Sequence, residues 1–353
     1  MIKLYIPSID FTQTNKLQLF VLTRPFYKKT GWVNDLKIQQ RWNISYAYQY
    51  TSNIAEATLF LLPLPVNYYI DSGQRNLLQS YHELCLFYKI KGYGFISGDF
   101  GKAYPEFSTF TYFRMGGFKR QLSNKNLGFP ASLSDHFQNI YKLEDPIPRP
   151  KTTVPVIGFC GHATGSPIKR TKEVVKCLLE NTKRFIQNPF RKDWEPLFAS
   201  AYERWQLLQL LEHSQDLHTQ FIYRNHYRGG ALTEEEQHAT TLDYYDNLLQ
   251  SDYVLCLRGA GNFSIRFYET LMMGKIPIFV NTDCLLPLAN DIDWKEHVVW
   301  VEWHERYQIA SKVVDFHKTI SQEAFMELQI RNRKLWKEQL TVGTYLQKLA
   351  NAL

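Results

Sequence analysis

The chain has 353 residues, of which 44% are hydrophobic and 15% aromatic. This is enough apolar material for two packed domains, and it excludes a mainly disordered protein. The net charge of +7 is compatible with an anionic substrate or a membrane surface, but it does not indicate nucleic-acid binding. The most apolar run, residues 57–70, contains prolines and is too short to span a bilayer.

The cysteines and the N-terminal sequence lead us to expect a cytoplasmic protein. The five cysteines form no C-x-x-C pair and no Cys/His metal spacing, which favours reduced thiols. The opening sequence MIKLYIP predicts a first strand rather than a signal peptide.

Strands and helices alternate in the first part of the chain, which predicts an α/β domain with a mainly parallel sheet. The pattern indicates strands at residues 2–6, 58–62, 93–97 and 109–114 and a helix at 77–89. Asp99 follows the third of these strands, where cleft residues lie, although Gly98-Asp99 is also a common turn sequence.

Residues 144–155 contain four prolines and no periodicity, so they are the expected linker between domains 1–150 and 151–353. A strand at 156–160 and a loop of small residues at 161–166 should follow. Arg170 is then expected near the start of a helix. The later pattern predicts a long helix at 194–213, a short strand at 221–223 and a helix at 242–249.

The stretch from Ser251 to Asn281 predicts a β-α-β unit. A buried strand at 253–257 is followed by a loop of small residues, Ser264 as helix N-cap, and a helix that ends near Gly274 and Pro277. A second buried strand covers 276–280. Such units place ligands at the carboxyl ends of their strands.

Charged residues surround the start of that helix. Arg258 and Arg266 flank a place where free backbone N–H groups and the helix dipole favour an anion. Glu269 lies on the same helical face as Arg266 and could accept two hydroxyl groups. The alternative is a surface ion pair between Arg266 and Glu269, which would contribute little to stability.

These residues carry a resemblance to the exostosin-like glycosyltransferases, glycosyltransferase family 47. The resembling pattern comprises Leu257-Arg258-Gly259, Ser264-x-Arg266-x-x-Glu269, Gly274-x-Ile276-Pro277, Pro287 and Ile292-x-Trp294. It is specific over this stretch and loose elsewhere. It implies an α/β chain of the GT-B architecture, with two Rossmann-like domains facing across a cleft: an N-terminal acceptor-side domain and a C-terminal nucleotide-sugar-binding domain. In this architecture a last helix that crosses back onto the N-terminal domain is a further expectation.

The resemblance implies a metal-independent, inverting transfer of a sugar from a nucleotide-diphosphate donor, with UDP expected, to a carbohydrate acceptor in polysaccharide or glycan synthesis. Arg258 and Arg170 would offset charge on the diphosphate, and Glu269 would hold the ribose. Ser264, Gly259 and nearby N–H groups would hold the phosphate with support from Arg266, while His162 is a candidate substrate contact. The base would come from the N-terminal domain, with Asp99 and Asp10 as candidates.

No cofactor beyond the nucleotide-sugar substrate is expected. Asp291-Ile292-Asp293 has the D-x-D form of some metal-dependent transferases, but it occupies the position of the Ile-x-Trp stretch, so we interpret it as a turn. Gly259-Ala260-Gly261 lacks the third glycine of a dinucleotide fingerprint, since Ser264 stands there, which disfavours an NAD enzyme.

Two carbohydrate-related alternatives stay open. The first is a fucosyltransferase-like GT-B enzyme that uses a GDP-sugar, although that family carries a Lys beside the Glu and an Asn-Ser loop where this chain has Arg266 and Arg258. The second is a catalytically inactive carbohydrate-binding relative, because no base is identifiable.

The C-terminal residues 322–349 predict one amphipathic helix with a mixed charged face. Weak peripheral docking of this helix to anionic lipid is a further possibility, which would place the protein at the inner face of a membrane.

Overall fold

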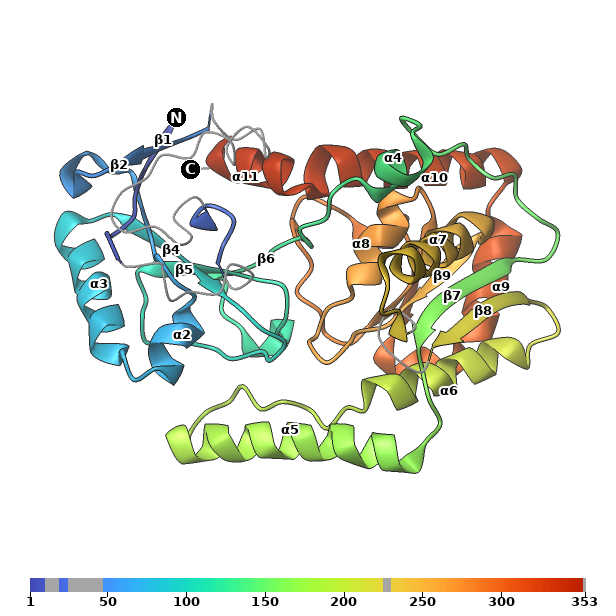
Figure 1. Cartoon of the computed structure of the whole chain (residues 1–353), viewed down its shortest axis with the longest axis horizontal. Coiled ribbons are helices and arrows are strands. Elements are labelled where there is room, and N and C mark those ends of the chain that lie inside the picture. Colours follow the sequence, from blue (N-terminus) through green and yellow to red (C-terminus); the bar gives the residue numbers. More distant parts are fainter. Residues whose placement is uncertain (10–18, 25–46, 225–229, 352–353) are drawn as a thin grey trace. The chain divides into compact units, whose positions relative to one another are not determined.

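The computed structural model describes residues 1–9, 19–24, 47–224 and 230–351 (Figure 1). Asp10 is therefore outside the described residues. The chain divides into two compact units. The first comprises Met1–Ser132, Leu285–Leu288 and Gln339–Leu353, and the second comprises Leu133–Cys284 and Ala289–Glu338.

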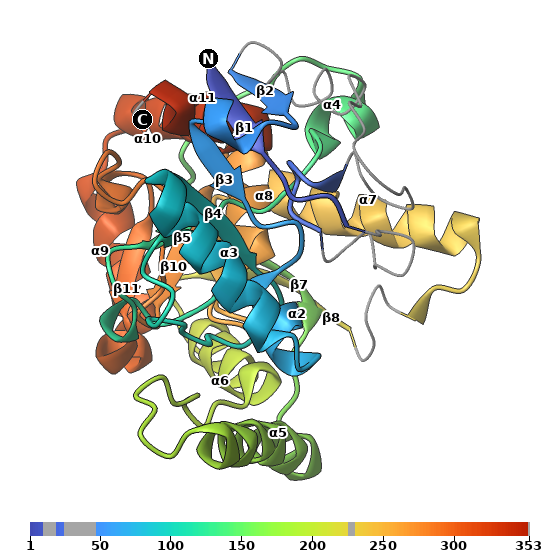
Figure 2. The same ribbon diagram turned by 90° about the vertical axis from the view of Figure 1, so that its left-hand side faces the viewer.

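The first unit contains a parallel sheet. Across the sheet the strands are β2 (Tyr48–Thr51), β1 (Ile2–Tyr5), β3 (Leu59–Leu61), β4 (Lys91–Ile96), β5 (Phe110–Arg114) and β6 (Asn126–Gly128). The helices α2 (Val66–Asp71) and α3 (Arg75–Tyr88) connect β3 to β4, and Figure 2 shows α3 lying along the sheet. Aromatic stacking fills the core: the Phe20 ring lies 5.2 Å from Phe113 and 5.2 Å from Phe129.

The last helix, α11 (Val342–Asn351), packs into this same core. The Tyr345 hydroxyl donates to the carbonyl of Gly128 at 2.7 Å, and the Tyr48 hydroxyl donates to the carbonyl of Leu346 at 2.8 Å. These buried contacts join the C-terminal end of the chain to its first sheet.

The second unit contains another parallel sheet. Its strands, in order, are β11 (Val299–Glu302), β10 (Ile276–Asn281), β9 (Tyr253–Cys256), β7 (Val156–His162) and β8 (His218–Arg224). Its helices are α4 (His136–Tyr141), α5 (Pro167–Gln187), α6 (Ser200–Glu212), α7 (Glu234–Gln250), α8 (Ile265–Met272), α9 (Ile309–Thr319) and α10 (Gln322–Leu335).

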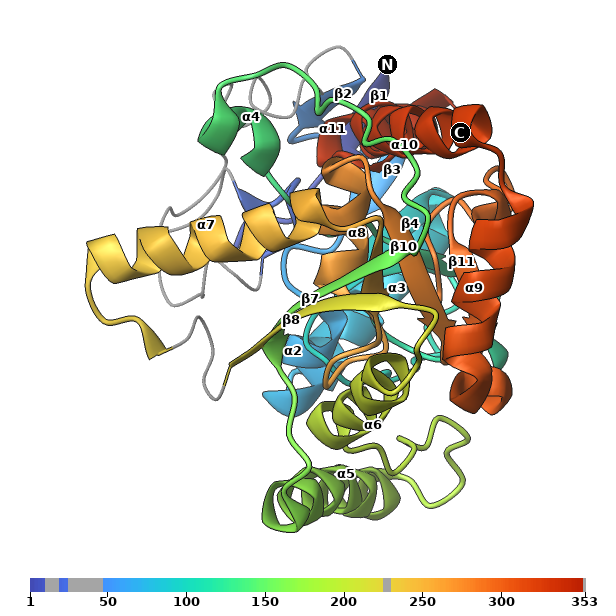
Figure 3. The same cartoon turned by 90° about the vertical axis from the view of Figure 1, so that its right-hand side faces the viewer.

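Helices cover both faces of this second sheet (Figure 3). The helices α6 and α9 pack on the face that contains Ile157, Leu255 and Ile278. The helices α7 and α8 cover the opposite face, where the ring of Phe267 in α8 lies 4.9 Å from that of Phe279. Gly158 lets α7 approach β7, because a Cβ there would lie 2.0 Å from the Ser251 Oγ. Both units therefore confirm the predicted α/β class, while the cleft between two domains stays a prediction.

Three predicted helices have different bounds in the structure. The helix expected from residue 194 begins only at Ser200, because Glu195 exchanges backbone hydrogen bonds with the Asn181 side chain at 2.8 and 2.9 Å. The helix expected at 242–249 begins earlier, at Glu234, where Thr233 and Glu236 form a capping box.

The C-terminal helix predicted at 322–349 is interrupted. The helix α10 ends at Leu335, a π-helical turn covers Trp336–Leu340, and α11 then begins at Val342. The interruption coincides with the passage from the second unit to the first. Residues 133–150, which the sequence analysis assigns to the first domain, group with the second unit.

The described part of the chain contains no helix with both the length and the apolar character needed to cross a membrane. All five cysteines are free, and four of them are buried.

Candidate functional site

Arginine side chains converge at the carboxyl end of β7, beside the N-terminus of α8. Arg266 lies in the first turn of α8, with its guanidinium 4.3 Å from the centre of the Phe159 ring. Its Nη2 donates to the carbonyl of Cys160 at 2.8 Å. Its Nε is buried and has no hydrogen-bond partner among the described residues. This arginine is thus placed by an aromatic ring and a backbone carbonyl rather than by a carboxylate.

Gly161 leaves room for this placement. A Cβ at residue 161 would lie 2.6 Å from the Nη2 of Arg266, well inside van der Waals contact. The small-residue loop predicted after the first strand of the second unit therefore makes room for Arg266.

Arg204, in α6, belongs to the same cluster of arginines and was not among the residues singled out from the sequence. Its guanidinium donates to the carbonyl of His162 at 2.5 Å and to the carbonyl of Arg258 at 3.2 Å. Burial lowers the pKa of Arg204, and the like charge of Arg266 lowers it further, although a guanidinium stays protonated in proteins. The Nε of Arg204 is also buried without a hydrogen-bond partner in the described part of the chain. Two cationic groups therefore repel each other at this point, and an anion between them would relieve the repulsion.

Arg258 lies nearby, but its charge is compensated inside the second unit. It is only 3% exposed, and its Nη2 lies 3.0 Å from the Oε1 of Glu195. The Phe198 ring lies 4.7 Å from its guanidinium. Arg258 therefore anchors the segment before α6 through Glu195, and its expected role toward a diphosphate stays a prediction.

Glu269 accepts hydrogen bonds from two phenol hydroxyls of α7. The Tyr244 hydroxyl lies 2.5 Å from its Oε2 and the Tyr245 hydroxyl 3.2 Å from its Oε1. Burial, followed by the charge of Glu269, raises the pKa of Tyr244 well above its usual value, so the hydroxyl remains a donor. Since Arg266 instead donates to Cys160, these contacts replace the surface ion pair considered above.

The remaining predicted residues of this unit have varied surroundings. His162 is half-buried, with its Nδ1 2.9 Å from the carbonyl of Arg224, which is a structural contact. Arg170 is exposed in the first turn of α5, with its guanidinium 4.6 Å from the Tyr202 ring. Ser264 is the N-cap of α8 as predicted, but its side chain makes no capping hydrogen bond. Gly259 borders open space, since a Cβ there would meet no atom within 4 Å.

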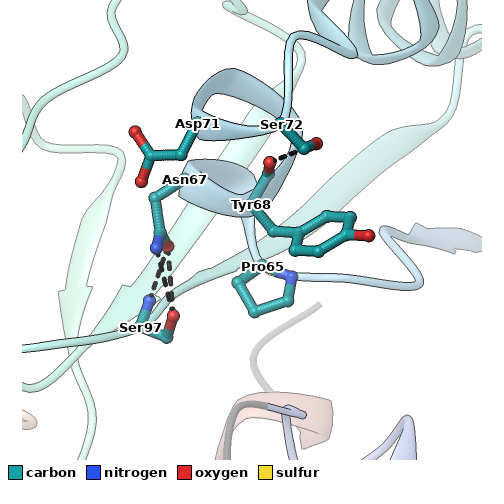
Figure 4. A pocket seen from close by; sticks show the side chains of 6 residues that line it. All are labelled: Pro65, Asn67, Tyr68, Asp71, Ser72 and Ser97. Carbon is teal, nitrogen blue, oxygen red and sulfur yellow. Dashed lines mark hydrogen bonds between the residues drawn. The ribbon is translucent and has the colours of Figure 1, made fainter. Parts of the chain in front are cut away.

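The first unit has a polar pocket of its own at the carboxyl end of β4 (Figure 4). Its volume is about 300 Å³, and Ser97 and Asn67 hold its wall through a hydrogen bond of 3.0 Å from the Ser97 N–H to the Asn67 Oδ1. The carboxylate of Asp71 also borders it, 3.3 Å from the Nζ of Lys102. Asp99 is exposed in the bend that follows β4 and does not line this pocket.

Asp293 caps a short 3-10 helix, Trp294–Glu296, with its Oδ1 accepting from the N–H of Lys295 at 3.1 Å. Within the described ranges, no group of three or more His, Cys, Asp and Glu side chains could hold a metal ion.

Comparisons with known proteins place a family domain on the second unit. Residues 185–313 match the model of the exostosin GT47 domain. The chain is 31% identical to exostosin-1 of Drosophila melanogaster over 104 residues, which cover 30% of the chain and 13% of that protein. It is 36% identical to the probable beta-1,4-xylosyltransferase IRX10 of Arabidopsis thaliana over 64 residues, covering 18% of the chain and 15% of that protein. The chain thus spans only a small part of these relatives.

Solved structures give a distant likeness. The crystal structure of TarM has a TM-score of 0.36 at 10% identity and covers 74% of this chain and 50% of its own. A glycosyltransferase from Rickettsia africae has a TM-score of 0.35 at 10% identity, covering 99% of this chain and 97% of its own.

The matched segment contains Arg204, Arg258, Arg266 and Glu269, whereas β7, which supplies their backbone partners Cys160 and His162, lies before it. The resemblance to the exostosin-like glycosyltransferases is thereby confirmed for this part of the chain, because residues 185–313 match the exostosin GT47 domain model.

Proposed function

We propose that the protein is a glycosyltransferase that moves a sugar from a nucleotide-diphosphate donor to a carbohydrate acceptor, and that the donor binds at the carboxyl end of β7 and the start of α8. The exostosin GT47 domain supports the reaction class. The observation that carries the site is the carboxylate of Glu269, which accepts from two hydroxyl groups next to a pair of arginines.

The diphosphate would lie against Arg266 and Arg204, with the free backbone N–H groups at the start of α8 as further donors. Both guanidinium groups are fixed by backbone carbonyls, so they are already positioned before a ligand arrives. As the bond between the sugar C1 and the phosphate oxygen breaks, negative charge collects on the leaving diphosphate. Fixed guanidinium groups would stabilise that charge without a metal ion. Arg258 would contribute mainly by holding the segment before α6.

The ribose would bind Glu269. Its two carboxylate oxygens each accept from one tyrosine hydroxyl, and a ribose offers two neighbouring hydroxyls with the same donor role. Binding would therefore exchange the Tyr244 and Tyr245 hydroxyls for those of the nucleotide.

The acceptor would bind the first unit, whose polar pocket offers Asn67, Asp71 and Ser97 to sugar hydroxyls. An inverting reaction needs one base to deprotonate the acceptor hydroxyl. Asp99 and Asp10 remain candidates, and the pocket adds Asp71 to them. A UDP-sugar donor, inversion, a role in glycan synthesis and a cytoplasmic location all belong to this proposal.

A thermal-shift screen of the whole chain against UDP, GDP, CDP, ADP and NAD tests the proposal. A nucleotide that binds the native state raises its melting temperature by mass action, and we expect the largest shift with UDP. A dominant shift with GDP would favour the fucosyltransferase-like alternative. A shift with NAD alone, or with no nucleotide, would overturn the proposal.

A second measurement separates an enzyme from an inactive relative. We expect an active transferase to hydrolyse the matching nucleotide-sugar slowly. The assay measures the free nucleotide that this hydrolysis releases. Tight nucleotide binding without release from any nucleotide-sugar, with or without added glycans, would indicate a binding protein.

A further inference from the structure

Helix α5 carries an unusual number of exposed apolar side chains. Its 21 residues pack outside α6, on the side away from the second sheet (Figures 2 and 3). The exposed apolar residues are Ile168, Val175, Leu178, Leu179, Phe185 and Ile186, with Phe190 just beyond the helix end. Single exposed apolar residues are ordinary, but a contiguous group on one helix marks an interaction surface.

These residues form a stripe on the outer face of α5. At about 100° per residue, Ile168, Val175, Leu179 and Ile186 project within about 40° of one line along the helix. The opposite face is the one that packs, because Cys177, Glu180 and Arg184 are buried. The stripe, defined by these four residues, therefore points away from the unit.

A row of lysines borders the stripe. Lys169, Lys172, Lys176 and Lys183 are exposed and project within about 60° of one another, on one side of the stripe. Arg170 is the only other exposed charged residue of α5, whose residues are all described.

The two acidic residues of α5 are turned toward the protein. Glu173 accepts from the Ser200 hydroxyl at 3.3 Å and from the N–H of Ala201 at 3.1 Å. Glu180 forms a buried ion pair with Arg184 at 3.0 Å. The outer surface of α5 is therefore both apolar and uniformly positive.

We propose that α5 is an interfacial helix that lies flat on an anionic lipid surface, with the stripe among the acyl chains and the lysines at the phosphate groups. An amphipathic helix with apolar residues on one face and lysines beside them binds in this way. Each lysine near an anionic surface adds a comparable increment of attraction, and these charges are not opposed by exposed acids on the helix.

The lipid-facing element is thus a different one from the C-terminal helix considered in the sequence analysis. In α10 the cation Arg333 is 3% exposed and lies 2.6 Å from Asp135 and 2.7 Å from Asp145. Lys337 also lies 3.1 Å from Asp145. These two cations are therefore paired with carboxylates of the second unit. The proposal for α5 does not depend on the proposed catalytic function, because its readout is binding alone.

Co-sedimentation of the whole chain with vesicles tests this proposal. One set of vesicles contains phosphatidylcholine alone and the other contains phosphatidylcholine mixed with phosphatidylglycerol. We expect binding to the mixed vesicles and little binding to the neutral ones. Replacing Lys172 and Lys183 by Gln should weaken binding to the mixed vesicles about tenfold or more. Replacing Leu179 and Ile186 by Gln should abolish it, since the buried apolar area is lost.

Matched controls use exposed residues elsewhere in the second unit. Arg331→Gln with Lys334→Gln removes the same charge from α10, and Leu232→Gln removes an exposed apolar side chain outside α5. Both should bind vesicles like the unchanged chain. Equal loss in the α10 control, or no binding to the mixed vesicles, would overturn the proposal. The proposal would also be overturned if size-exclusion chromatography showed a dimer that becomes a monomer in the double variant Leu179→Gln with Ile186→Gln. The stripe would then be covered by a second copy of the chain.

Discussion

Lys275 is a buried cation in mainly apolar surroundings. It is 2% exposed and borders a pocket of about 390 Å³ that is lined mostly by Pro, Leu, Ile and aromatic side chains. Its Nζ lies 3.4 Å from the Oε1 of Gln329. Burial, followed by the like charge of Arg149, lowers the pKa of Lys275 to about 8, against a smaller opposing effect of Asp252. Keeping this ammonium charged therefore costs stability at neutral pH.

Replacing Lys275 by Met should stabilise the protein at pH 7. Below about pH 8 the folded chain carries the unfavourable charge, and between about pH 8 and 10.5 the unfolded chain binds a proton that the folded chain does not. The stability of the unchanged protein thus rises over this window, and the gain from Lys275→Met should shrink from at most about 3 kcal/mol at pH 7 toward zero near pH 10. Urea melts at both pH values measure this, with the exposed Lys318→Met as control. The same gain at both pH values would contradict the account.

At the residue scale, the sequence predicted the positions of Arg266 and Glu269 in their helix, while their role in binding stays a prediction. Arg266 and Glu269 stand at the start of α8, where their spacing and the helix N-terminus indicated them. The compensation of the Arg258 charge by Glu195 could not be predicted, because the two residues are distant in sequence and meet only in the folded chain. Arg204 was missed since a single arginine in an apolar helical pattern is ordinary.

At the scale of elements, α7 and α8 are coupled through Glu269. The Tyr244 hydroxyl occupies the carboxylate oxygen that the ribose is proposed to use. Nucleotide binding would have to break this hydrogen bond, so the contact between the two helices should lower the affinity.

Tyr244→Phe should therefore tighten nucleotide binding. A hydrogen bond to a charged acceptor contributes about 1.5–3 kcal/mol, so the dissociation constant should fall about tenfold or more. Calorimetry with the preferred nucleotide measures the change. Tyr141→Phe is the matched control, because that hydroxyl lies 2.6 Å from the Asp246 carboxylate outside the site. Weaker binding in Tyr244→Phe would mean that the tyrosine contacts the nucleotide itself.

The segment between α5 and α6 depends on Glu195. This carboxylate is 2% exposed and lies 3.0 Å from Arg258 and 3.6 Å from Arg184. Glu195→Gln would leave both guanidinium groups buried with less compensation, and breaking a buried ion pair costs about 3–5 kcal/mol. Denaturant melts should show a loss of that order. Glu305→Gln, which breaks the surface pair with Lys312, should have a much smaller effect, because solvent screens exposed pairs. If Glu195→Gln lost no more stability than Glu305→Gln, the structural role of the Glu195–Arg258 pair would be contradicted.

The strands were predicted better than the helix ends. Continuous apolar runs located β1, β3, β4, β5, β7, β9 and β10, because a buried parallel strand has a strong sequence signal. The helix bounds at Ser200 and the π-helical turn at 336–340 depend on contacts made only in the folded chain, namely the Asn181–Glu195 hydrogen bonds and the passage between units.

At the scale of the whole molecule, the chain joins two parallel-sheet units and its last helix packs into the first. The net charge of +7 is concentrated in places, such as the outer face of α5 and the arginines beside α8. The net charge alone could not distinguish these two groups of cations, which the fold places on different elements.

Turnover should not require a divalent metal ion. The guanidinium groups of Arg266 and Arg204 would supply the positive charge that a metal supplies to the diphosphate in other transferases. Activity assays in excess EDTA should therefore match those in buffer alone. Loss of activity in EDTA and recovery with manganese would contradict this and would favour Asp291 and Asp293 as metal ligands.

The central claim is that Glu269 binds the ribose of a nucleotide, and Glu269→Gln tests it most directly. The amide keeps the shape of the carboxylate but replaces one acceptor oxygen by a donor group. Because hydrogen bonds to a charged acceptor contribute about 1.5–3 kcal/mol, calorimetry with the preferred nucleotide should show an affinity at least about tenfold lower. A denaturant melt of the same variant should also show some loss of stability, because Glu269 accepts from Tyr244 and Tyr245 in the nucleotide-free chain. Unchanged nucleotide affinity in Glu269→Gln would contradict the account.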